Sequence, residues 1–151
     1  MTYSQQLASY KAANLTVQKT RQLVMLYDAI ISYLQQAKVA IEEKRINDRY
    51  NLLVKAGNII SGLNLSLDYA KGGEISHMLG NYYFAIDLRI MGLNRSNSLS
   101  DCDGIIAEVK MMRDAWDKID QELSLPIGAP KAAERVKAEE EKEKTAADFS
   151  A

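Results

Sequence analysis

The sequence is poor in the residues that build metal and disulfide chemistry. Its 151 residues include one cysteine and one histidine. A single cysteine excludes an internal disulfide and a cysteine-based zinc cage. A single histidine excludes a metal site that needs several imidazole ligands. We therefore expect neither a metal ion nor a cofactor.

An excess of one charge sign and long apolar runs are also missing. Basic residues number 19 and acidic residues 20, so there is no basic excess of the kind that indicates a nucleic-acid partner. No apolar run approaches the roughly 18 residues that a membrane span needs. Residues 1–11 lack the apolar core of a signal peptide. These absences predict a soluble, cytoplasmic protein without membrane insertion.

The chain is instead dominated by helical periodicity. Apolar residues recur three or four positions apart over four long stretches, so that each stretch lines one face of a helix. No stretch alternates with the period of two that a strand requires. Long helices joined by short connections predict an all-α, antiparallel four-helix bundle. The four apolar stretches cover residues 23–41, 52–67, 75–93 and 105–123.

Polar and glycine-rich segments separate these stretches and predict where each helix begins. Asn47 is placed to cap the second helix. Gly72 and Gly73 allow the left-handed backbone that ends a helix, so we expect the third helix to start near Glu74. Ser100 offers a capping-box start for the fourth.

Composition divides the chain into three regions. Residues 1–15 form an N-terminal arm, with tyrosine and leucine at helical spacing that predicts a short helix. Residues 16–124 form the helical bundle domain. Residues 125–151 start with two prolines and continue with alanine, glutamate and lysine. That tail has too few large apolar residues to offset the entropy of ordering, so we expect a disordered segment or a frayed helix.

Motifs that would indicate catalysis are incomplete. Glu74 and His77 match one half of the Glu-x-x-His pattern of di-iron bundles, which need two such motifs and two more glutamates. Cys102 lies at a helix start, where its thiol pKa could fall, but Asp101 and Asp103 oppose a thiolate. The sequence therefore predicts a binding protein rather than an enzyme.

The helices carry apolar residues beyond one face each. Val24 and Ile31 are seven positions apart, as are Leu53 and Ile60, so each pair lies on one line of its helix beside the main stripe. Such extra stripes either widen the core or line surface grooves for an amphipathic partner helix. We select the following residues as candidate partner-binding positions: Tyr10, Val24, Ile31, Leu53, Ile60, Met78 and Tyr83.

Three stretches resemble signatures of the FliS family of flagellar secretion chaperones. They are residues 25–30 (MLYDAI), 67–75 (LDYAKGGEI) and 112–116 (MRDAW), in the order and spacing of the family. The resemblance covers about residues 10–123, with Tyr10 in the place of the arm tyrosine. The tyrosine-aspartate pair usual in the third helix is replaced by residues 82–84 (YYF), which indicates a divergent member.

The resemblance implies a helical bundle that binds the disordered C-terminal segment of flagellin in the bacterial cytosol. Such chaperones prevent premature polymerisation and assist delivery to the flagellar export gate. No nucleotide, metal or other cofactor is needed. A helical adaptor for another export substrate or regulator is an alternative, and a helix-bundle metal protein is a weaker one. Exposed grooves could also pair in the absence of cargo, so the free protein is expected to be a monomer or a weak homodimer.

Overall fold

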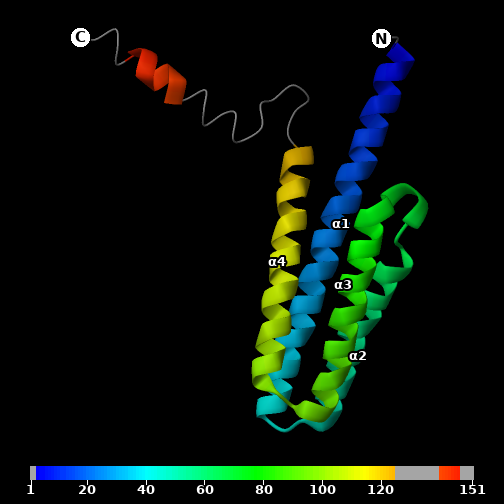
Figure 1. The fold of residues 1–151 in the computed structure, drawn as a ribbon, viewed down its shortest axis with the longest axis vertical. Coiled ribbons are helices and arrows are strands. Elements are labelled where there is room, and N and C mark those ends of the chain that lie inside the picture. The colour runs from blue at the N-terminus through cyan, green and yellow to red at the C-terminus, as the bar shows by residue number, and fades with distance from the viewer. Residues whose placement is uncertain (1–2, 125–139, 147–151) are drawn as a thin grey trace.

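Four long helices make up the body of the protein (Figure 1). The computed structural model describes the backbone of residues 3–124 and 140–146, and the side chains of residues 19–124 and 140–146. Residues 140–146 form a further short helical segment, and the rest of the expected tail lies outside the described residues. The long helices are α1 (Tyr3–Glu42), α2 (Ile46–Leu65), α3 (Tyr69–Ser96) and α4 (Leu99–Leu123).

Consecutive helices run in opposite directions and close into a bundle. Helix α1 packs against α2 and α4, and α3 packs against α2 and α4. The connections between α1 and α2 and between α3 and α4 lie at one end, and that between α2 and α3 lies at the other (Figure 1). The predicted antiparallel four-helix bundle is confirmed.

The N-terminal arm is the first part of α1. A helix over these residues was expected, but as a short element separate from the bundle domain. Instead α1 runs from Tyr3 to Glu42 and reaches well past the connection between α2 and α3 (Figure 1). This stretch contains neither glycine nor proline, so nothing in it interrupts the backbone hydrogen bonds. The side chain of Tyr10 lies outside the described ones.

The helix starts differ from the predicted ones by two to five residues. The N-cap position of α2 is Arg45, two residues before Asn47, and its side chain forms no capping hydrogen bond to the backbone. Helix α4 is capped by Ser98, not Ser100, and the Ser98 hydroxyl accepts a hydrogen bond from the Asp101 amide at 3.1 Å. A residue with left-handed backbone lies two positions before each of these helices. Lys44 precedes α2 and Asn97 precedes α4, and the chain reverses direction there.

Helix α3 begins before the glycine pair instead of after it. The Asp68 carboxylate accepts hydrogen bonds from the amides of Ala70 and Lys71, both at 3.0 Å, which is the geometry of an N-cap. Gly73 then adopts φ 51° and ψ −127°, so the helix is kinked there. The Ser76 hydroxyl donates to the Asp68 carbonyl at 2.9 Å and ties the two sides of the kink together.

The core is wider than one stripe per helix, because a second line of apolar residues is also buried. In α2 Leu53 and Ile60 are buried beside Ala56 and Leu63, whereas Leu52 and Ile59 are half-buried at the edge of the core. In α3 Tyr83 is buried and Ile75 of the predicted stripe is 63% exposed. The fully buried large side chains are Tyr27, Tyr83, Ile30, Leu34, Leu53, Ile60, Ile86, Ile90, Leu93, Ile105, Val109 and Cys102.

Polar contacts hold α4 against α1 along its length. The Thr20 hydroxyl donates to the buried Asp120 carboxylate at 2.9 Å. Ion pairs join Arg113 to Asp28 and Lys38 to Asp103, each at 2.9 Å. The interface of α3 with α4 is the smallest of the four, and an ion pair between Arg89 and Glu108 crosses it at 2.7 Å. Helices α1 and α4 therefore share the most extensive interface of the bundle.

Candidate functional site

The structure places most of the predicted binding residues in the core. Five of them are between 1% and 8% exposed, namely Val24, Ile31, Leu53, Ile60 and Tyr83. Of the two alternatives for the secondary stripes, the structure shows the wider core for these five side chains, which do not lie on the surface of a groove. Met78 is 59% exposed and keeps its place on the surface. Tyr10 cannot be placed, since its side chain lies outside the described ones.

These side chains are buried because of the way the helices are rotated about their own axes. A helix with two adjacent apolar stripes can turn either one toward the centre of a bundle, and the period of the pattern is the same in both cases. Packing against two neighbours selects the orientation that buries more apolar surface. In this bundle both stripes are largely covered, so the surface grooves are lined by other residues.

One apolar groove runs between α1 and α2 near the end where α2 finishes. It encloses about 540 Å³ and is lined by Leu23 and Leu26 of α1 and by Ile59, Gly62 and Leu63 of α2. Polar side chains border it: Lys19, Gln22 and Ser66.

Gly62 keeps the α1–α2 groove open. A Cβ atom at this position would meet no atom within 4 Å, so space is left over the backbone of α2. Sequence reasoning took no notice of this glycine. A glycine inside a helix lowers stability by about 1 kcal/mol relative to alanine. Its presence within the second apolar stretch therefore indicated a position where a side chain is disfavoured for packing or function.

A second group of exposed apolar side chains lies near the same end, on α3 and α4. Ile75 and Met78 stand on the first turns of α3 after the kink. Ile119 and Leu123, each about two-fifths exposed, stand on the last turns of α4. Because α3 begins at the end of the bundle where α4 finishes, these four residues mark one end of the molecule (Figure 1). This is also the end beyond which α1 extends.

The hollow between α1 and α4 has a different character. It encloses about 650 Å³, and Val24 and Met25 share it with charged residues of both helices. The Arg113 guanidinium donates to Asp28 at 2.9 Å and lies 3.6 Å from Asp117. Paired charges make this face less suited to an apolar anchor than the groove between α1 and α2.

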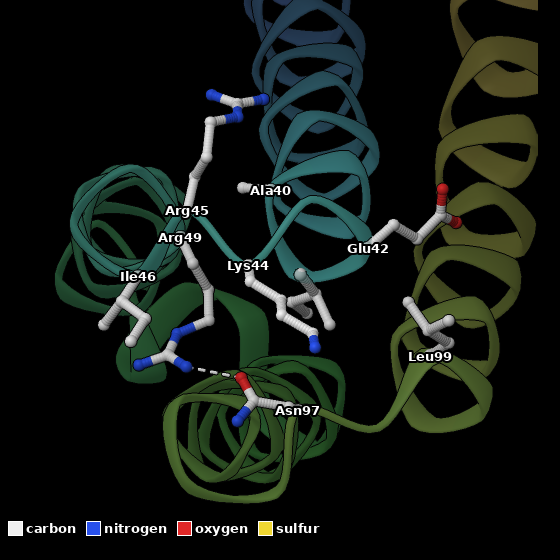
Figure 2. A pocket seen from close by; sticks show the side chains of 9 residues that line it. Ala40, Glu42, Lys44, Arg45, Ile46, Arg49, Asn97 and Leu99 are labelled. Atoms are coloured by element: carbon white, nitrogen blue, oxygen red, sulfur yellow. Dashed lines mark hydrogen bonds between the residues drawn. The ribbon is translucent and has the colours of Figure 1, made fainter.

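The opposite end of the bundle holds a hollow of about 520 Å³ where the two helix connections meet (Figure 2). The Arg49 guanidinium of α2 donates a hydrogen bond to the Asn97 side chain, which follows α3. Arg45 forms ion pairs with Glu43 and Asp48. The Arg49–Asn97 hydrogen bond joins the two connections, and Arg45 is paired with acidic residues next to its own connection, so we assign this hollow a structural role.

The reactive side chains of the described residues are in unreactive surroundings. Cys102 is fully buried, its thiol donates to the Leu34 carbonyl at 3.5 Å, and burial raises the pKa of that thiol. His77 lies beside Tyr69, with 4.9 Å between the ring centroids. In the part of the chain that the structure describes, no three histidine, cysteine or acidic side chains are grouped to hold a metal ion. What this surface offers is apolar grooves for binding.

The described helices were also compared with the requirements of a membrane span. None of α1 to α4, nor the segment 140–146, combines the length and the apolar character needed to cross a bilayer.

Comparison with known proteins gives one consistent family. The model of the family described as flagellar protein FliS matches residues 2–123. The chain is 31% identical over 96 residues to the flagellar secretion chaperone FliS of Campylobacter jejuni, covering 63% of this chain and 74% of that protein. It is 32% identical over 99 residues to FliSB of Pseudomonas aeruginosa, covering 66% and 79%. It is 28% identical over 117 residues to FliS of Salmonella typhimurium, covering 77% and 87%.

Proposed function

The chain belongs to the FliS family of flagellar secretion chaperones, and we propose that it binds the disordered C-terminal segment of flagellin in the bacterial cytosol. Bound in this way, flagellin is kept from polymerising before export and is delivered to the gate of the flagellar type III export apparatus. The protein acts by binding alone and catalyses no reaction.

The observation that carries this proposal is the apolar groove between α1 and α2. Its length lies along two helices, and Leu23, Leu26 and Ile59 offer contacts to apolar anchors spaced along a partner helix. A disordered segment loses conformational entropy when it folds onto a surface. Burial of each large aliphatic anchor contributes about 1.5–3 kcal/mol, so a few anchors offset that loss.

The candidate binding residues divide by their position. Leu26 of the groove and Met78 at the end of the bundle are exposed and contact cargo directly in this proposal. Tyr10, in the first part of α1, stays a candidate at the edge of the groove. The buried candidates, such as Ile31 and Ile60, support the groove from beneath and would touch cargo only if the helices separated. Without cargo, the exposed grooves are expected to leave the protein a monomer or a weak homodimer.

Filling the groove tests the proposal. Gly62→Leu places a side chain in open space above α2 and should leave the bundle folded while it blocks the groove. We expect calorimetric titration with a peptide of the flagellin C-terminal segment to show binding at least about tenfold weaker, because one anchor of leucine size loses its place.

The matched control is Gly92→Leu on α3. A Cβ atom at Gly92 also meets no atom within 4 Å, and Gly92 lines none of the hollows described above. It should bind as the unchanged protein does. If Gly62→Leu binds the flagellin peptide as tightly as Gly92→Leu and the unchanged protein, the binding surface lies outside the α1–α2 groove. A protein that captures another export substrate and not flagellin would favour the adaptor alternative.

A further inference from the structure

A separate, smaller groove lies between α2 and α3. It encloses about 190 Å³, and its apolar lining comes from Leu53, Val54, Ile90 and Met91. Val54 and Met91 of this lining are exposed, and the same two helices carry further exposed apolar side chains. These side chains, each between 39% and 64% exposed, are Tyr50, Val54, Phe84, Leu88 and Met91.

An unpaired carboxylate stands in this groove, whose lining also includes the polar residues Asn58 and Ser61. Asp87 of α3 lines the groove and forms no hydrogen bond or ion pair with any described residue. Its partial burial raises the pKa of the carboxyl group. Gly57 of α2 faces it, and a Cβ atom there would lie 3.2 Å from Asp87 Oδ1, so the carboxylate is held close to the α2 backbone.

A second unpaired acceptor lies along the same groove. Asn94 is seven residues after Asp87, which is two helical turns or about 10 Å. Its side-chain oxygen Oδ1 is buried and lacks a donor among the described residues. Buried polar atoms in native proteins are nearly always hydrogen-bonded, so the buried Asn94 oxygen indicates a missing donor, whereas the half-buried Asp87 carboxylate is still reached by solvent.

We propose that the α2–α3 groove binds an amphipathic helix of the export cargo that carries a lysine or arginine among its apolar anchors, and that Asp87 pairs with this cation. The inference rests on the proposed function and adds a selectivity for basic residues to it. The apolar rim, with Phe84, Leu88 and Met91 at successive turns of α3, receives the anchors. The carboxylate then favours a cation over a neutral side chain, because charge-assisted hydrogen bonds are the stronger ones in a partly dry groove.

The charge at Asp87 also argues against other occupants. An anionic membrane surface or a nucleic acid would be repelled by the carboxylate. A helix with only apolar anchors would leave the carboxylate buried without a partner, which is costly. A cationic helix removes this cost and supplies donors for the neighbouring acceptor Asn94.

The experiment compares Asp87→Asn, Asp87→Leu and the control Glu122→Gln, each in the full chain with monomeric flagellin as the probe. Glu122 is an exposed acid on α4 and does not line the groove. Thermal melts first establish that the variants are folded. We expect Asp87→Asn to bind at least about tenfold more weakly at low salt, with the difference shrinking as salt rises, and Glu122→Gln to bind normally.

The contrary results are distinct from those that test the chaperone role. If the unchanged protein binds flagellin and both Asp87 variants bind as tightly, with the same salt dependence, Asp87 does not select a cation and this inference alone is wrong. If the Asp87 variants change self-association in sedimentation instead of flagellin binding, the groove is an interface between two copies. If the unchanged protein does not bind flagellin, the proposed function fails and this inference fails with it.

Discussion

Two tyrosine hydroxyls meet inside the bundle and link α1 to α3. The Tyr27 hydroxyl donates to the Tyr83 hydroxyl at 2.8 Å, and the ring centroids are 6.4 Å apart. Burial raises the pKa of both hydroxyl groups, and burial also raises the pKa of the neighbouring Tyr82 to about 12. All three stay neutral at physiological pH, so the contact is a neutral hydrogen bond in an apolar surrounding.

Removing one hydroxyl of this pair should lower the free energy of unfolding more than removing both. Tyr27→Phe leaves the Tyr83 hydroxyl buried without its donor and is expected to destabilise the protein by about 1–3 kcal/mol. Adding Tyr83→Phe removes the stranded group and should restore part of that loss. Urea unfolding of the two single variants and the double variant measures the coupling. Strictly additive changes would show that the two hydroxyls do not depend on each other.

At the scale of the element, α3 shows two different uses of glycine. Gly73 has φ 51°, in the left-handed region that side chains with a Cβ disfavour, and it forms the kink after the first turn. Gly92 lies in the regular part of the same helix, with open space where a Cβ would be. The first is required by the backbone conformation, and the second is not.

These two positions should respond to alanine in opposite directions. Gly92→Ala reduces the freedom of the unfolded chain and is expected to stabilise the protein by about 0.5–1 kcal/mol. Gly73→Ala forces a Cβ into left-handed backbone and is expected to destabilise it by about 1–2 kcal/mol. Chemical denaturation of both variants provides the comparison. A stabilising Gly73→Ala would mean that the kink is not needed for the packing of α3.

At the scale of the whole molecule, the bundle consists of the pair α1 and α4 and the hairpin of α2 and α3. Helices α1 and α4 are joined by polar contacts along their length, and α1 continues past the hairpin of α2 and α3 (Figure 1). Every side chain of the core cluster belongs to residues 27–109. The composition of residues 131–151 supplies no apolar stripe that could extend this core.

A chain that ends at Leu125 should therefore keep both fold and binding. We expect its melting temperature and its affinity for the flagellin segment to match those of the full chain. Circular dichroism and calorimetric titration are the measurements. A shortened protein that remains helical but no longer binds would give the tail a direct part in the interaction.

Much of this architecture is determined by the sequence alone. The spacing of apolar residues specifies four helices, and polar or glycine-rich segments separate them, because these local patterns depend on one chain segment at a time. Three short stretches, residues 25–30, 67–75 and 112–116, identify the family. Helix starts were predicted less well. Helix α3 begins directly after Asp68 and not after the glycines, because the Asp68 carboxylate accepts hydrogen bonds from two amides of the first turn.

The grooves were decided only by the tertiary structure. Trp116 of the fourth apolar stretch is half-buried at the edge of the core and not inside it. Leu53 lies beside the main apolar stripe of the sequence and is nevertheless buried, because α2 is turned so that Leu53 faces the centre together with Ala56 and Leu63 of that stripe. Periodicity shows which residues share a side of a helix, but the rotation of each helix depends on the shape of its neighbours. For the same physical reason, the meeting of Asp87 with Gly57 across two helices exists only once the bundle has formed.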